Sequence, residues 1–122
     1  MELPEFVRIL GRNFDIEFSD DALESNKYAV CKIDKRKIVL NSNPDYEPEI
    51  LDSVVHEILH AVAWFTGLGL DSDVEERVIK TLTSGLVGVF YDNPDLVEWM
   101  LSCVAIVEFE SESSAESDSK GS

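Results

Sequence analysis

Both histidines of the chain lie in one short segment, VVHEILHAV, at residues 54–62. His56 and His60 are four residues apart, and Glu57 directly follows the first of them. On a helix, residues four apart share a face about one turn from each other, so both imidazoles can reach one ion. Neutral imidazole binds zinc, and a carboxylate one step round the helix can take a proton from water that the ion activates. The segment therefore predicts two zinc ligands and a general base, Glu57, within five residues.

The alternative interpretation is a helix that merely contains two histidines, because HExxH also occurs by chance. Two features favour the metal site. The chain has no other histidine, and the motif lies among apolar residues. An unpaired imidazole in such a setting would cost free energy.

A third ligand is needed, because a catalytic zinc takes three protein ligands. The segment DSDVEERVIKTL, at the predicted start of the next helix, is the nearest acidic source. A short glycine-containing connection would fold that helix back, so Glu75 or Glu76 would approach His60. Helical periodicity does not decide between the two glutamates, and the alternative is that both only stabilise the helix N-terminus. Three less favoured candidates are Asp71, Asp73 and Cys103.

The strands that would support this helix follow from alternation and turn signals. FDIEF (14–18) alternates apolar and polar residues, as a half-buried strand does. FVRIL (6–10) either continues that strand, with a bulge at Gly11, or forms a short helix. YAVCKI and KIVLN flank DKRK, which predicts a hairpin of Tyr28–Ile33 with Lys37–Asn41.

Three helices are predicted after the hairpin. The first spans about Pro48–Thr66, with apolar residues at intervals of three and four and glycines at its end. The second spans about Val74–Tyr91, with acidic residues in its first turn. A short helix, about Asp95–Leu101, follows the break at DNP, and CVAIVEF (103–109) is ambiguous between helix and strand.

Length and composition favour one folded domain with an acidic tail. The chain has 122 residues, of which 44% are hydrophobic, and this is enough for one core of moderate size. The final stretch is rich in Ser and Glu and almost free of apolar residues, which is typical of disorder. We therefore expect a domain at residues 1–109 and a disordered tail at residues 110–122.

The net charge of −15 excludes binding to nucleic acid through phosphates, which requires clustered Lys and Arg. It fits either simple solubility or an encounter with a basic partner. No apolar run is long enough to span a membrane, and MELPEFVRIL lacks the pattern of a signal peptide. We expect a cytoplasmic protein whose two cysteines, Cys31 and Cys103, are reduced and at least partly buried.

The motifs together resemble a known family. HEILHAV, a short loop, an acidic helix start and LTSGLVGVFYDNP resemble the minimal zincins encoded by phages and prophages. These are compact, gluzincin-like HExxH metallopeptidase domains, similar in style to the SprT-like and ImmA/IrrE groups. The upstream VRILGRNFDIEF and YAVCKIDKRKIVLNS resemble the strands that precede HExxH in such domains. The resemblance covers about residues 6–100.

The resemblance implies a fold and a ligand set. The fold is a small α+β, zincin-like domain, in which a three-stranded, mostly antiparallel sheet packs on the HExxH helix and a second long helix. The implied Zn²⁺ ligands are His56, His60 and Glu76, with Glu75 as the alternate, and Glu57 is the base. The strand KIVLN is implied to lie at the edge of the active cleft, where a substrate peptide can pair with it.

The chain departs from larger relatives of that family. It has no C-terminal subdomain to form a second cleft wall, and no helix-turn-helix. No Tyr or His is evident as an oxyanion stabiliser, and Tyr46 and Tyr91 have no assigned role. Cys31 is interpreted as a small buried apolar residue rather than a switch on zinc. Trp64 and Trp99 are interpreted as core or partly exposed packing residues.

The expected function is a zinc-dependent metallopeptidase that hydrolyses peptide bonds in a peptide or protein substrate, in the host cytoplasm if phage-encoded. The alternative is a non-enzymatic, acidic phage accessory protein that keeps a zincin fold and binds a basic host protein. A third interpretation is a structural zinc site closed by four protein ligands.

Overall fold

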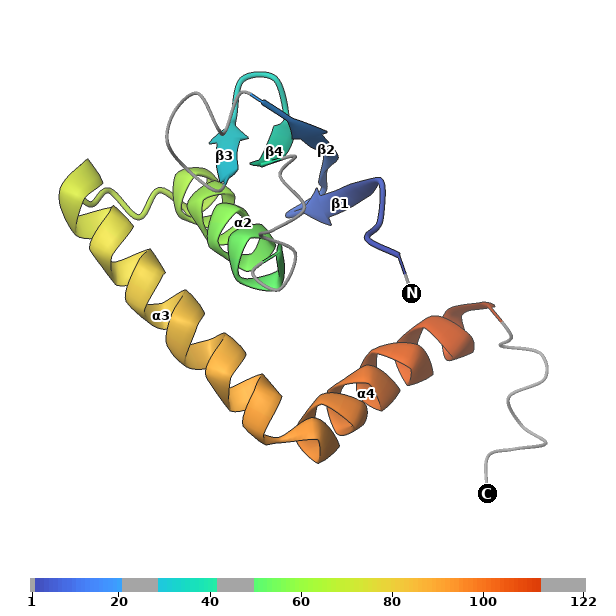
Figure 1. The fold of residues 1–122 in the computed structure, drawn as a ribbon. Helices are drawn as coiled ribbons and strands as arrows, with labels where there is room; N and C mark the ends of the chain where they lie inside the picture. The colour runs from blue at the N-terminus through green and yellow to red at the C-terminus, as the bar shows by residue number, and fades with distance from the viewer. Residues whose placement is uncertain (1, 21–28, 42–49, 113–122) are drawn as a thin grey trace. The chain divides into compact units, whose positions relative to one another are not determined.

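The structure, a computed structural model, describes residues 2–20, 29–41 and 50–112, and the side chains only as far as residue 105. It is a small α+β structure with one four-stranded mixed sheet and, in the described ranges, three helices (Figure 1). The chain divides into two compact units, residues 1–87 and residues 88–122. In chain order the elements are β1 (Phe6–Ile9), β2 (Arg12–Ser19), β3 (Ala29–Lys32), β4 (Lys37–Asn41), α2 (Ile50–Thr66), α3 (Ser72–Asp92) and α4 (Pro94–Glu112).

The sheet has the strand order β1-β2-β4-β3. β1 pairs antiparallel with β2, and β3 pairs antiparallel with β4. The two hairpins meet where β2 and β4 run parallel, with Ile16 opposite Ile38. The prediction of three strands is therefore wrong in number, and the sheet is mixed, with two antiparallel pairings and one parallel pairing. Whether the elements pack as in a zincin stays a prediction.

The extra strand results from a tight turn that the sequence pattern did not reveal. FVRIL is neither a continuation of the next strand nor a helix, because β1 ends at Ile9 and β2 begins at Arg12. Leu10 and Gly11 form the connection, with φ angles of 50° and 85°. Two positive φ angles are what a type I′ hairpin turn requires, and Asn-Gly is its usual signal. Leucine at the first position hid the turn.

The predicted hairpin is confirmed as β3 (Ala29–Lys32) with β4 (Lys37–Asn41), with Val30 opposite Val39, while Tyr28 lies outside the described residues. Its place in the sheet differs from the expectation. KIVLN is β4, which lies between β2 and β3, and β3 is the edge strand. The central position explains the composition of β4, because Ile38, Val39 and Leu40 are all buried and so both faces of the strand are covered.

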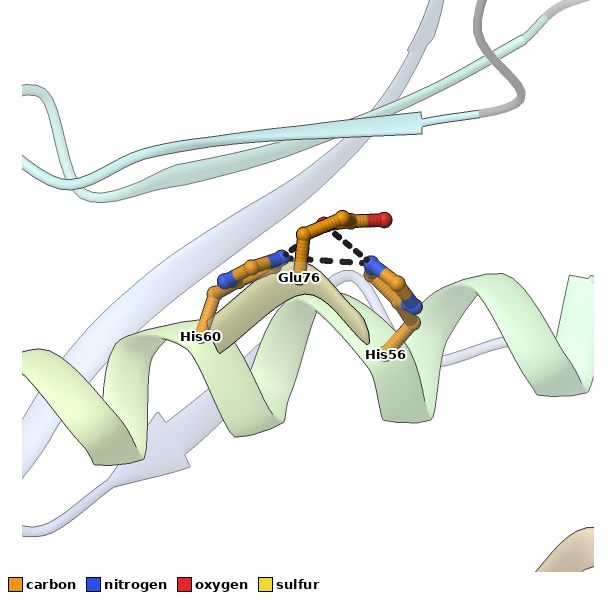
Figure 2. Close-up of side chains that lie close together, drawn as sticks. All are labelled: His56, His60 and Glu76. Carbon is orange, nitrogen blue, oxygen red and sulfur yellow. Dashed lines mark hydrogen bonds and ion pairs between the residues drawn. The ribbon is translucent and has the colours of Figure 1, made fainter. Parts of the chain in front are cut away.

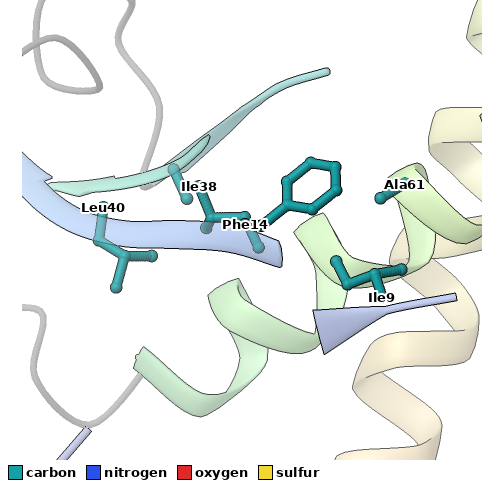
Figure 3. Packing of buried hydrophobic residues seen from close by; sticks show 6 residues of the cluster. Ile9, Phe14, Ile38, Leu40 and Ala61 are labelled. Carbon is teal, nitrogen blue, oxygen red and sulfur yellow. The ribbon is translucent and has the colours of Figure 1, made fainter. Parts of the chain in front are cut away.

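The core lies where α2 packs against β1, β3 and β4 (Figure 1). Its buried members are Ile9, Phe14, Ala29, Ile38, Leu40 and Ala61, of which five are labelled in Figure 3. Phe14 is fully buried and meets Phe65 of α2 edge to face, with ring centroids 6.0 Å apart. Burial of a phenylalanine side chain stabilises a fold by about 1.5–3 kcal/mol. These contacts fix α2 against the sheet.

The helix ends agree with the predictions in α2 and differ in the later helices. α2 ends at Thr66, as predicted, while residues 48 and 49 lie outside the described residues. α3 is longer than predicted by two residues at its start and one at its end. α4 extends to Glu112, far beyond the predicted Leu101, so the ambiguous residues 103–109 are helical. The proposed tail thus begins inside α4, and its residues 113–122 lie outside the described residues.

None of the described helices combines the length and the apolar character that a membrane span requires.

The turn between β1 and β2 gives a test of this description. Leu10 is 54% exposed and has a positive φ, so it contributes little packing and carries backbone strain. We expect Leu10→Asn to raise the free energy of unfolding by about 0.5–1 kcal/mol, because asparagine tolerates this conformation. Leu10→Val, the matched apolar control, should lower it. Urea unfolding measures both, and equal effects of the two substitutions would contradict the turn assignment.

Candidate metal centre

Helix α2 presents both histidines on one face. Their ring centroids are 4.8 Å apart, and the two Nε2 atoms are 3.2 Å apart. Both rings are partly buried, with 17% of the His56 side chain and 23% of the His60 side chain exposed. The imidazoles therefore direct the same ring atom toward one point, as spacing by one helical turn predicts.

The connection after α2 brings an acidic helix start to this point. The helix ends in a Schellman motif, in which Leu68 N–H donates to the Ala63 carbonyl and Gly67 N–H donates to the Trp64 carbonyl. Gly67 and Gly69 have φ angles of 69° and 73°, which suit glycine. The chain then turns into α3, which carries Glu75 in its first turn and Glu76 directly after it.

Glu76 completes a triangle with the histidines (Figure 2). Its Oε1 lies 2.9 Å from His60 Nε2 and 3.2 Å from His56 Nε2. Among the described residues these three side chains form a group that could hold a metal ion, with all three ligand atoms within 4.8 Å of one another.

The dimensions of the triangle test which ions fit. A tetrahedral zinc ion with bonds of about 2.0–2.1 Å separates its ligand atoms by about 3.3 Å. An octahedral ion with bonds of about 2.1 Å separates neighbouring ligand atoms by about 3.0 Å. The observed sides of 2.9–3.2 Å lie close to both values. Two imidazoles and one carboxylate suit zinc with an open position, and they also suit iron in a facial triad.

Glu75 contacts the same histidine from the other side. Its Oε2 lies 2.8 Å from His60 Nδ1, the ring nitrogen that faces away from the triangle. A carboxylate that accepts the second N–H of a ligand histidine fixes its tautomer and orientation. The structure thus brings both predicted glutamates to His60, at different ring atoms, and only Glu76 joins the three-atom group.

The contacts shift the pKa of His60 and of Glu76 in opposite directions. Burial lowers the pKa of His60, but hydrogen bonds to Glu75 and Glu76 and the charge of Glu57 outweigh it. The pKa of His60 therefore lies above its ordinary value of 6.5. Burial raises the pKa of Glu76, but its hydrogen bond with His60 and the nearby His56 outweigh it. The pKa of Glu76 lies below its ordinary value of 4.5.

Glu57 is buried, with 7% of its surface exposed. It lines a cleft that also contains His56, His60 and Glu76. Its charge acts on two neighbours, His60 and Cys31 of β3. Burial raises the pKa of Cys31 to about 12, and the negative charge of Glu57 adds to the rise. A thiolate is the form that binds metals, so the raised pKa disfavours metal binding by Cys31 at neutral pH. The side chain is partly buried rather than buried as expected.

The cleft has a volume of about 1190 Å³ and includes the whole group. One wall comes from β3 and Ile33, and the floor comes from α2 and the first turns of α3. The resemblance implied that KIVLN lies at the edge of the cleft. Instead β3, AVCK, is an edge strand of the sheet and lines the cleft. Trp64, which we interpreted as a packing residue, is 68% exposed and lines the cleft. Its position four residues after His60 could have indicated this.

The other candidates lie outside the three-atom group. Asp71, Asp73 and Cys103 do not belong to it. Tyr46 falls outside the described residues, and Tyr91 is 66% exposed near the end of α3.

Comparisons with known proteins add nothing to this geometry: the chain matches no protein-family model, and no curated protein or solved structure is detectably similar to it. The fold and the site therefore define only a small α+β protein with a candidate His–His–Glu metal centre. The resemblance to the minimal zincins stays a prediction.

The different contacts of the two glutamates predict different losses of metal affinity. Glu76→Ala removes a ligand and should weaken zinc binding by more than about 100-fold, whereas Glu75→Ala should weaken it by about 10–100-fold. Glu98→Ala is the control, because it removes one exposed carboxylate of α4 that does not line the cleft. Competition with a chromophoric chelator measures all three. A larger loss for Glu75→Ala than for Glu76→Ala would reverse the assignment.

The pKa shifts predict how metal-free protein responds to pH. A raised pKa for His60 means that its contribution to stability is complete below 6.5 and is lost as pH rises through the folded-state pKa. The lowered pKa of Glu76 means that its contribution is complete above 4.5 and is lost as pH falls through the folded-state pKa. Bound metal reverses the alkaline trend, because it displaces protons.

Thermal unfolding of the parent and of His60→Gln between pH 5 and pH 9 checks this expectation. The difference in Tm between them should shrink with rising pH in chelator and grow with rising pH in zinc. The same trend in both solutions would show that protons and metal do not compete for the site.

Proposed function

We propose that the protein is a zinc-dependent metallopeptidase that hydrolyses peptide bonds in the cleft beside β3. The observation that carries the proposal is the triangle of His56 Nε2, His60 Nε2 and Glu76 Oε1, with sides of 2.9–3.2 Å. The donor set of two imidazoles and a carboxylate supports an ion with an open coordination position. The cleft, large enough for several peptide residues, supports a polymeric substrate.

The chain's own residues have distinct roles in this proposal. His56, His60 and Glu76 would hold the ion, and Glu75 would keep the ring of His60 oriented. When bound, zinc supplies Lewis acidity, which polarises a carbonyl and makes water easier to deprotonate. Glu57 would accept a proton from the attacking water and deliver it to the leaving amine. The burial of Glu57 supports this role, because a carboxylate shielded from bulk solvent keeps the proton close to the reaction.

The central test separates chemistry from metal binding. Glu57→Gln keeps the shape of the side chain but removes the base, so hydrolysis of a casein or peptide-library substrate should fall by about 10²–10⁴-fold. Elemental analysis should still find one zinc per chain. His60→Ala is the matched control, which should lose both the metal and the activity.

Two results would contradict the proposal. One is a Glu57→Gln variant that cleaves as fast as the parent. The other is a parent that, after dialysis against equal zinc, iron and manganese, retains iron or manganese and excludes zinc.

A further inference from the structure

The lining of the cleft is strongly acidic. Among the described residues that line it, the carboxylates are Asp52, Glu57, Asp73, Glu75 and Glu76, and the ammonium group is that of Lys80. A bound divalent cation would still leave this lining two formal charges negative. A cleft lined by one sign of charge concentrates ligands of the opposite sign.

The cleft lining extends along α2 on both sides of the metal group, His56, His60 and Glu76. Asp52 precedes His56 on α2 by four residues, and Trp64 follows His60 by four. All four side chains line the cleft, which makes a row along the helix with a step of about 6 Å. Asp73, at the start of α3, also lines the cleft. The row therefore has an acidic side chain at one end and an exposed indole at the other.

The spacing of the row matches that of an extended peptide. In a strand, alternate side chains point to the same side about 6.6 Å apart. β3 has β4 as its one neighbour in the described part of the sheet, so its outer edge can pair with such a peptide. A peptide paired with β3 would place four successive same-side residues over Asp52, His56, His60 and Trp64, because three steps of about 6.6 Å match the roughly 18 Å from Asp52 to Trp64 along the helix.

The exposed indole favours a cationic side chain. Trp64 is 68% exposed although it faces the cleft, and a lysine or arginine over an indole face gains about 0.5–1 kcal/mol at an exposed site. A neutral or acidic side chain gains no such contact and meets the negative lining.

We propose that the cleft selects extended polypeptide segments that carry Lys or Arg, with one basic side chain over Trp64. A second basic side chain is favoured two residues beyond the metal group, toward Asp52. This selectivity rests on the proposed peptidase function for its biological meaning, but it is a binding property and can be measured without catalysis.

The test uses zinc-loaded Glu57→Gln protein and three fluorescein-labelled eight-residue peptides. Their alternate residues are Lys, Gln or Glu in an otherwise identical Ser-Ala background. Fluorescence anisotropy should show that the Lys peptide binds at least about tenfold more tightly than the Gln peptide, and that the Glu peptide binds most weakly. The same titration on metal-free parent protein gives the ranking without relying on the variant.

Variants in the cleft locate the effect. Trp64→Ala and Asp73→Asn should each weaken binding of the Lys peptide by about two- to fivefold and leave the Gln peptide unchanged. Trp64→Phe should retain part of the preference. Glu98→Gln is the control, because it removes one exposed charge of α4 that does not line the cleft.

The outcomes separate the two proposals. Equal binding of the Lys and Gln peptides would overturn the selectivity, as would equal effects of Asp73→Asn and Glu98→Gln, which would indicate a general surface field. Tight binding of the Lys peptide with no cleavage by zinc-loaded parent would contradict the peptidase function and leave the selectivity standing. Equal binding of the Lys and Gln peptides, together with cleavage of both by zinc-loaded parent, would support the peptidase function and overturn the selectivity.

Discussion

Three side-chain atoms with lone pairs meet at one point of this protein. They need a positive charge between them, and this need shapes the rest of the site. His56 Nε2, His60 Nε2 and Glu76 Oε1 lie 2.9–3.2 Å apart. Such atoms repel one another unless a proton or a metal ion lies between them. The raised pKa of His60 and the lowered pKa of Glu76 describe how protons meet this need. A divalent ion would relieve the same repulsion with a larger positive charge and with coordination bonds in fixed directions.

The fold holds the two histidines of this group firmly on α2, but it holds Glu76 on α3 through few contacts. α2 packs on the sheet through Phe14, Ala61 and their neighbours, so the imidazoles stand on a fixed base. α3 buries only a narrow stripe, Ile79, Thr83 and Val87, and most of its other side chains are exposed. The approach of Glu75 and Glu76 therefore depends on the glycine turn after α2 and on their own contacts with His60. Charge pairing here helps to place a helix, in addition to its chemical role.

The sequence predicted best the elements in which local pattern and tertiary structure agree. Intervals of three and four located α2 and α3, and the turn signal DKRK located the hairpin of β3 with β4. The local pattern could not supply the neighbour of β4 across the sheet, because parallel pairing of β2 with β4 joins distant segments. Leucine in a positive-φ turn concealed β1.

For the site, the spacing of the histidines on one face was predictable from the helix period alone. The division of the glutamates between two nitrogens of one ring was not. Adjacent residues on a helix differ in direction by about 100°, so periodicity allows either to approach. The distances to Nδ1 and Nε2 depend on how α3 enters after Gly69, which is a tertiary property.

The central place of β4 constrains how the molecule can assemble during synthesis. β2 and β3 share no partner until residues 37–41 have left the ribosome, so before then the described strands can form only the hairpin of β1 with β2, which is marginally stable alone. Ile38 and Leu40 also supply the surface on which α2 rests. The complete surface on which the histidine-bearing helix packs therefore requires β4 in the middle of the sheet.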